Sequence, residues 1–326
     1  MLSGPYRRIH LRFASRTIES SVRTNGQTFV ISPFTSRRRA ERIKMQNFEN
    51  RKMRNFEKGI LEALKKEGVD AEQVTVTKNG VPCKGFRIIT SDGQVSPVVY
   101  FSEEETISEF VARVHRIMAE KLPEIPTQKM TDWKYVRDNI FLSLAKRGTE
   151  EVVKKQYLNL ELQIRLRLDL GPDQTGTIRV TEKLIEATGV SEEDFWKAAE
   201  KNTASAAFIC SMAELLGLYA DNDDTLYVAT THLPGGASVL YLPDLFRQYC
   251  EEHGEEMCYI LPSSTEEVIV IAGSKLGVDM EVSDLAYIVN EINTAQVDPI
   301  LQLEPVVYQY KVSSREIKMI CRAEVQ

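Results

Sequence analysis

The stretch that most constrains the fold of this chain runs from Leu158 to Leu170, where leucine or isoleucine alternates with a polar residue. A repeat of two is the repeat of a β-strand, because successive side chains of a strand point to opposite faces of its sheet. The pattern predicts one long strand with an apolar face and a solvated face, and therefore a sheet that covers a core on one side. Turn residues over 171–176, followed by Thr177 to Thr181, predict an antiparallel partner strand.

Two hairpin signals lie upstream of this strand. Asn79-Gly80 and Asp92-Gly93 are dipeptides that favour the tightest hairpin turns, and they separate three runs rich in β-forming residues. Apolar residues at helical spacing precede and follow these runs. We therefore expect a three-stranded meander packed with helices, with strands at Gln73 to Lys78, Lys84 to Thr90 and Val95 to Phe101.

The second half of the chain mixes strands and helices without the regular rhythm of a βαβ fold. Ser191 is expected to cap a helix that continues through Asn202. Strand signals cover Thr225 to Thr231 and, beyond a Gly235-Gly236 turn, Ser238 to Tyr241. Further expected elements are a helix with apolar positions from Leu242 to Cys250, strands at Met257 to Leu261 and Val268 to Ala272, a helix from Val282 to Ile292 and a hairpin around Ser313-Ser314.

This element order predicts an α+β fold class with antiparallel sheets: a three-stranded meander plus helix, then a mixed strand and helix part. Three parts are expected along the chain. Residues 1–52 form a basic extension that is disordered or lies before the true start of the protein, at Met45 or Met53. Residues 53–150 form an N-terminal α+β part, and residues 151–326 form a C-terminal α+β part.

Charge is distributed unevenly between the extension and the rest. Residues 1–44 carry a balance of +8, whereas the remaining residues carry −14. An acidic body repels phosphate backbones, so nucleic-acid binding is not expected of the folded part. For the extension, organellar targeting and nucleic-acid contact remain alternatives to disorder or an over-called start.

Composition narrows the class of protein. Apolar residues make up 43% and charged residues 27%, which is typical of a globular chain, and no apolar run approaches the ~18 residues of a membrane-spanning helix. The five cysteines contain no Cys-x-x-Cys pair and no secretion signal precedes them, so we expect free thiols in a reducing cytoplasm. We expect a soluble cytoplasmic protein without membrane contact.

One short segment has the residue types of a metal site. Cys250, His253 and Cys258 lie close together with several glutamates, but not at the spacing of zinc ligands. His253-Gly254 is also the usual end of a helix, where a cation and a left-handed glycine are favoured. We therefore predict a helix end and no metal site, with Cys250 as a buried thiol.

Short stretches spread along most of the chain are typical of one known family. They are Asn55-Phe56-Glu57, Thr77-Lys78-Asn79-Gly80, Thr131-Asp132-Trp133, Glu200-Lys201-Asn202-Thr203, Leu226-Tyr227-Val228, Gly235-Gly236-Ala237, Tyr259 to Ser264 and Glu267-Val268. Through them the chain resembles, from about Met53 to Tyr310, the uncharacterised, mainly clostridial domain-of-unknown-function family 5688. It also has a fainter similarity, in its C-terminal part, to an uncharacterised family of cytosolic Bacillus proteins. The resemblance implies a bacterial cytoplasmic protein with an α+β fold and no known cofactor, and it transfers no catalytic residue.

Polar residues at the ends of predicted elements, within these stretches, are the candidate ligand-binding residues. We predict non-catalytic binding of a protein or small-molecule partner, because no acid/base pair or nucleophile elbow is present. The alternative is a hydrolase-like enzyme with its site near Asn202, His232 and Ser263. The full candidate set is Asn202, Thr203, His232, Ser263, Ser264 and Glu267.

Overall fold

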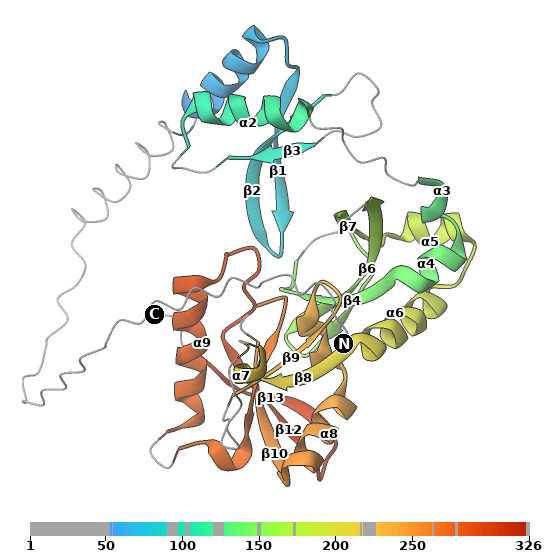
Figure 1. Ribbon diagram of the computed structural model, residues 1–326, viewed down its shortest axis with the longest axis vertical. Coiled ribbons are helices and arrows are strands. Elements are labelled where there is room, and N and C mark those ends of the chain that lie inside the picture. Colours follow the sequence, from blue (N-terminus) through green and yellow to red (C-terminus); the bar gives the residue numbers. More distant parts are fainter. Residues whose placement is uncertain are drawn as a thin grey trace, which may run out of the picture. The chain divides into compact units, whose positions relative to one another are not determined.

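The structure is a computed structural model (Figure 1). It describes residues 53, 55–89, 97–101, 105–119, 127–148, 151–171, 174–215, 217, 226–262, 264–277 and 280–323. The chain divides into two units, Met1–Asn55 and Phe56–Gln326, and almost all described residues belong to the second. The predicted basic extension over 1–52, the Asp92-Gly93 turn and Ser263 lie outside the described residues.

The predicted three-stranded meander is confirmed. Strands β1 (Ala71–Lys78), β2 (Val81–Ile88) and β3 (Val98–Tyr100) pair antiparallel in that order. Asn79 and Gly80 connect β1 to β2 with φ angles of 48° and 77°, the positive values that the central residues of a type I′ hairpin turn require. A helix over residues 55–66 and α2 (Ile107–Ala119) share an apolar core with the sheet, made by Ile60, Leu64, Phe86, Ile88, Val99, Phe110 and Val114.

The predicted long strand is β6 (Leu160–Gly171), the centre of a second sheet. Its antiparallel partners are β4 (Ile140–Ala145), β5 (Lys154–Tyr157) and β7 (Gln174–Arg179). The strand begins two residues later than predicted, because Leu158, with φ 53°, and Asn159 form the turn from β5. This sheet takes strands from both sides of residue 150, and the division of the chain there stays a prediction.

One face of β6 is buried as predicted, whereas its other face is solvated only in part, since Asp169 is exposed but Gln163 is buried. Gln163 lies on that face with only 1% of its surface exposed. Polar side chains there bond to one another and to nearby backbone, since Arg165 donates to Gln163 Oε1 at 3.1 Å and Glu161 Oε1 accepts from Gly148 N at 3.2 Å. The alternation identified the strand, but it could not show that other elements cover its polar side.

The third sheet has six strands in the order β13-β12-β10-β11-β9-β8, and all its pairs are antiparallel. Together with the helices this confirms the α+β fold class. The strands are β8 (Ala207–Ser211), β9 (Tyr227–Thr231), β10 (Met257–Leu261), β11 (Val268–Ala272), β12 (Val306–Lys311) and β13 (Glu316–Arg322). The remaining helices are α3 (Thr127–Met130), α4 (Trp133–Asn139), α5 (Glu182–Thr188), α6 (Glu192–Ala206), α7 (Met212–Leu215), α8 (Pro243–His253) and α9 (Val282–Gln296), with short 3₁₀ turns η1 (Gly236–Tyr241) and η2 (Gly273–Lys275).

The strand predicted at Ser238 to Tyr241 is wrong, because this segment is the 3₁₀ helix η1. The residues from Gly236 to Leu240 are all buried, so the segment has no solvated face that would impose a two-residue repeat. A short apolar run of this kind does not distinguish a strand from a helical turn.

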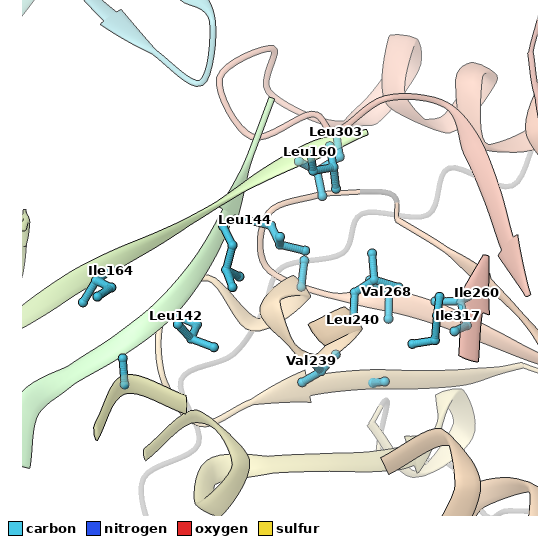
Figure 2. Close-up of a cluster of buried hydrophobic side chains, with 14 of the residues drawn as sticks. Leu142, Leu144, Leu160, Ile164, Val239, Leu240, Ile260, Val268, Leu303 and Ile317 are labelled. Atoms are coloured by element: carbon cyan, nitrogen blue, oxygen red, sulfur yellow. The ribbon is translucent and has the colours of Figure 1, made fainter. Parts of the chain in front are cut away.

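Two apolar cores flank the six-stranded sheet. Cys258 and Ile260 of β10 belong to the larger core, whereas the alternate residues Tyr259 and Leu261 belong to a smaller core beneath α9. The larger core lies between the four-stranded sheet around β6 and the six-stranded sheet (Figure 2). Leu142, Leu144, Leu160 and Ile164 share it with Val239, Leu240, Ile260, Val268, Leu303 and Ile317. Within the described residues, no helix is long and apolar enough to cross a membrane.

Candidate functional site

The candidate residues Asn202 and Thr203 lie near the end of α6, whose start is capped as predicted by Ser191. Thr203 is 1% exposed; its hydroxyl donates to Ala199 O at 2.8 Å and accepts from Leu142 N at 2.9 Å. Its hydrogen-bonding capacity is therefore used in joining α6 to β4. Asn202 is less buried, and its Nδ2 donates to two backbone oxygens at the end of α4, Arg137 O and Ile140 O, both at 2.8 Å.

The candidates Ser264 and Glu267 lie in the turn between β10 and β11. Ser264 Oγ donates to Glu267 Oε1 at 2.8 Å and accepts from Glu266 N at 3.0 Å. Ser264 is only 5% exposed, so these bonds satisfy a buried hydroxyl. They serve the conformation of the turn.

This turn also holds the predicted Gly235-Gly236 turn in place, and we call the two together the Glu266 turn (residues 234–237 and 264–267). Glu266 Oε2 accepts from Gly235 N at 3.1 Å, and Ala237 N donates to Thr265 O at 3.1 Å. Gly236 is packed so closely that an added Cβ would lie 2.0 Å from Thr230 Oγ1 and 2.2 Å from Glu266 O. Neighbouring side-chain and backbone atoms therefore fill the space that a phosphate would need at these glycines.

His232 is exposed, and its ring stacks on Phe208 with centroids 4.5 Å apart. Within the described residues no hydrogen bond joins His232 to Ser264 or to Asn202. A nucleophile and its base need to be within hydrogen-bond reach, or close to it in an unliganded site. The described contacts therefore lend no support to the hydrolase alternative, which stays a prediction, as does the candidate set itself.

The segment from Cys250 to Cys258 ends a helix, as predicted. Gly254 follows α8 in the left-handed conformation with φ 67°, and both ring nitrogens of His253 are occupied, by Tyr249 O at 2.8 Å and Tyr227 Oη at 3.0 Å. Cys250 and Cys258 are fully buried, and the neighbouring Cys250 thiol together with burial raises the pKa of Cys258. Raised pKa keeps that thiol protonated, whereas metal ligation needs the thiolate.

A groove between α4 and α6 is the concave feature that contains a candidate residue, Asn202. We call it the α4–α6 groove. Its main cavity has a volume of about 670 Å³, and a second cavity of about 220 Å³ shares Asp138 and Asn202 with it. The main cavity is lined chiefly by Trp133, Arg137 and Asp138 of α4 and by Lys197, Lys201 and Asn202 of α6; the second adds Asn139, Arg167, Ser205 and Leu233.

Local sequence signals build both walls of the groove. Asp132 caps α4 by accepting from Lys134 N at 3.0 Å, and Ser191 caps α6 by accepting from Asp194 N at 3.2 Å. Each cap satisfies backbone N–H groups that a helix start would otherwise leave unpaired. The Asn202 amide then fastens the end of α4 to α6.

Charge in the groove is only partly compensated. Arg137 Nε lies 2.9 Å from Asp138 Oδ1, and Lys197 Nζ lies 2.7 Å from Glu193 Oε1. Lys201 and Arg167, in contrast, have no carboxylate within ion-pair distance among the described residues. The main cavity thus presents three cationic side chains against the two carboxylates of Asp138 and Asp194.

The two tryptophans of the chain differ in their surroundings. Trp196 is 7% exposed, its Nε1 donates to Glu192 at 2.8 Å, and Lys155 lies over its ring at 4.2 Å. Trp133 is half-buried, packs on Phe195 with centroids 4.9 Å apart and also lines the groove. Both pack in or against the larger core, but only Trp133 lines the groove.

Of the residues that line this groove, Asn202 belongs to the candidate set predicted from the sequence, whereas Trp133, Arg137 and Lys201 do not. The sequence does show that Lys197 and Lys201 are one helical turn apart and so lie on the same face of a helix. Nothing local shows that α4 lies beside α6. The groove is therefore a product of tertiary packing.

Comparison with known proteins gives a family without an assigned activity. A family model described as "Family of unknown function (DUF5688)" matches residues 48–312 and so includes the whole groove. The match confirms the resemblance to that domain-of-unknown-function family. No curated protein and no solved structure gives a match.

Proposed function

We propose, for a chain that belongs to the DUF5688 family of unknown function, that it binds a small charged molecule bearing an anionic group in the α4–α6 groove. The observation that carries the proposal is a concave site in which Lys201 has no carboxylate partner among the described residues. The volume of about 670 Å³ falls in the range of about 300–1,000 Å³ that small-molecule sites occupy.

The sign of the charge supports an anionic ligand. Residues 45–326 carry a net charge of −14, yet cations outnumber carboxylates in this groove. A local cationic site within an acidic protein attracts small anions, whereas the surrounding charge repels a long polyanion such as nucleic acid. We propose a small molecule as the partner, and no membrane surface.

Binding is favoured over catalysis because the buried hydroxyls of the candidate set are already engaged. The hydroxyl groups of Thr203 and Ser264 both form hydrogen bonds within the chain. The five cysteines, free where the structure describes them, support the further proposal of a reducing bacterial cytoplasm as the location.

The test is thermal unfolding of the full chain with and without inorganic phosphate, citrate and nucleoside monophosphates. A ligand at one hundred times its Kd stabilises by ~2.7 kcal/mol, which raises the Tm by several degrees. Lys201→Ala should abolish the shift, and Lys183→Ala is the matched control because Lys183 is an exposed helical lysine outside the groove. A panel without any shift, or a shift that Lys201→Ala leaves intact, would count against the proposal.

A further inference from the structure

The geometry of the α4–α6 groove points to a ligand class, and we infer that its ligand joins a planar aromatic ring to an anionic group about one helical turn away. The ring lies against Trp133, and the anion lies between Arg137 and Lys201. This inference rests on the proposed function, since it specifies the ligand of the same groove.

The first step is the direction of the two helices. At their starts, Trp133 of α4 packs on Phe195 of α6, with centroids 4.9 Å apart. At their ends, Asn202 of α6 bonds to Arg137 O and Ile140 O of α4, both at 2.8 Å. The helices therefore run side by side in the same direction (Figure 1), and the groove between them has a distinct start and a distinct end.

The two ends of the groove differ in chemistry. At the start, the indole of Trp133 packs on Phe195 and also borders the cavity, so it can offer an aromatic surface to a ligand. At the end, Arg137 and Lys201 line the cavity from opposite helices, and the side chain of Arg137 is 51% exposed. A guanidinium and an ammonium that face one cavity form a seat for a carboxylate or a phosphate.

Helix geometry sets the separation of the two ends. Trp133 and Arg137 are four residues apart, and a rise of 1.5 Å per residue places them about 6 Å apart along α4. A ligand that uses both must carry its anion about that far from its ring. Nucleoside monophosphates and short aromatic carboxylates both meet this requirement, and they differ in the anion they present.

The carboxylates in the cavity do not cancel this seat. Asp194 Oδ2 accepts from Ser191 Oγ at 2.6 Å, and Asp138 pairs with Arg137 itself. Each therefore already has a hydrogen-bond donor, whereas Lys201 has no carboxylate partner among the described residues. Among the cations of the groove, Lys201 is thus the one that contributes most to the affinity for the anionic group of the ligand.

The experiment follows the fluorescence of Trp133 in the full chain carrying Trp196→Phe, which leaves one tryptophan. The ring-bearing probes are adenosine 5′-monophosphate and 3-phenylpropanoate; the half-ligands are adenosine and inorganic phosphate. We expect one of the ring-bearing anions to change the emission and to bind at least about tenfold more tightly than either half-ligand. The two ring-bearing probes separate a phosphate ligand from a carboxylate ligand.

Two variants assign the ends of the ligand, with affinity measured by calorimetry in the otherwise unchanged chain. Trp133→Leu should lower the affinity for the ring-bearing anion about tenfold and leave the affinity for inorganic phosphate unchanged, and Trp133→Phe should restore most of the lost affinity. Lys201→Ala should lower the affinity for the ring-bearing anion and for inorganic phosphate about tenfold and leave the affinity for adenosine unchanged. Unchanged thermal unfolding of the variants would show that they remain folded.

Two results would overturn the inference in different ways. If inorganic phosphate or citrate bound as tightly as the ring-bearing anions, and Trp133→Leu had no effect, the ring requirement would be wrong and the proposed function would stand. If no anion of either kind bound, both the inference and the proposed function would fail.

Discussion

The α4–α6 groove and the Glu266 turn are both rich in polar residues, but they use them in opposite ways. In the Glu266 turn the side chains of Ser264 and Glu266 bond to neighbouring atoms of the chain. In the groove, Lys201 and Arg167 have no carboxylate partner among the described residues. Polar residues therefore mark a binding site only where their hydrogen-bonding and ion-pairing capacity is left for a ligand.

Burial explains the difference. Ser264 and Thr265 are 5% and 8% exposed, and buried polar atoms must find hydrogen-bond partners within the protein. The groove side chains remain in water, since Arg137 and Lys197 are 51% and 68% exposed. Substitutions in the Glu266 turn should therefore affect stability, whereas substitutions in the groove should affect affinity.

The largest expected effect is that of Gly236→Ala. A methyl group there would overlap Thr230 Oγ1 at 2.0 Å and Glu266 O at 2.2 Å, so the two segments of the Glu266 turn must separate. We expect a loss of about 3 kcal/mol or more in the free energy of unfolding, measured by urea denaturation. Gly254→Ala is the control, because its φ is 67° with no atom within 4 Å, and it should cost only about 1–2 kcal/mol. Equal losses in the two variants would contradict the packing argument.

Thr203→Val comes next, because it removes a buried hydroxyl while nearly keeping the shape of the side chain. Leu142 N would lose its acceptor inside the protein, which costs about 2 kcal/mol in the free energy of unfolding. Urea denaturation of Thr203→Ser provides the comparison, since serine keeps the hydroxyl and loses only a methyl group, worth about 1 kcal/mol. If valine were tolerated better than serine, the hydrogen bond would not matter for stability.

Much of the fold could be predicted because its signals are local. The alternation in β6, the Asn79-Gly80 turn and the Ser191 cap each depend on a few adjacent residues, and the structure confirms all three. The η1 segment and the covered face of β6 could not be predicted, because their environment comes from distant parts of the chain. Gln163 is polar and yet buried for that reason.

The site was harder to predict than the fold. Asn202 follows from its position near the end of a helix, and the structure places it in the groove. Its partner Arg137 lies 65 residues earlier in the chain, and no local pattern relates the two. The predicted Ser264 and Glu267 lie in two of the stretches that carry the family resemblance, but their described contacts hold the turn together.

Asn202→Ala is expected to have the third largest effect on stability. It tests whether one side chain contributes both to the stability of the fold and to the affinity of the groove. The amide donates to Arg137 O and Ile140 O, so its removal should cost about 1 kcal/mol at this half-buried position. Because the end of α4 would loosen, affinity for a groove ligand should fall as well. Urea denaturation and calorimetry on the same variant measure both effects, and a loss of stability without a loss of affinity would make the amide purely structural.

Lys201→Ala should have the smallest effect on stability, and it separates the two regions most clearly. Lys201 is exposed and has no carboxylate partner among the described residues, so the free energy of unfolding should change by no more than about 0.5 kcal/mol. Affinity for an anionic probe such as inorganic phosphate should still fall about tenfold, because the ligand loses a charge-assisted bond.

Salt provides a second readout for the same lysine. Dissolved salt weakens the attraction between exposed charges, and at 0.1 M ionic strength the attraction is largely screened beyond about 10 Å. Raising sodium chloride from about 0.05 to about 0.5 M should therefore weaken binding of the anion to the unaltered chain more than to Lys201→Ala, whereas Lys183→Ala should follow the unaltered chain. Parallel salt curves for all three proteins would remove Lys201 from the site, and the contrast between the groove and the Glu266 turn would then lose its main support.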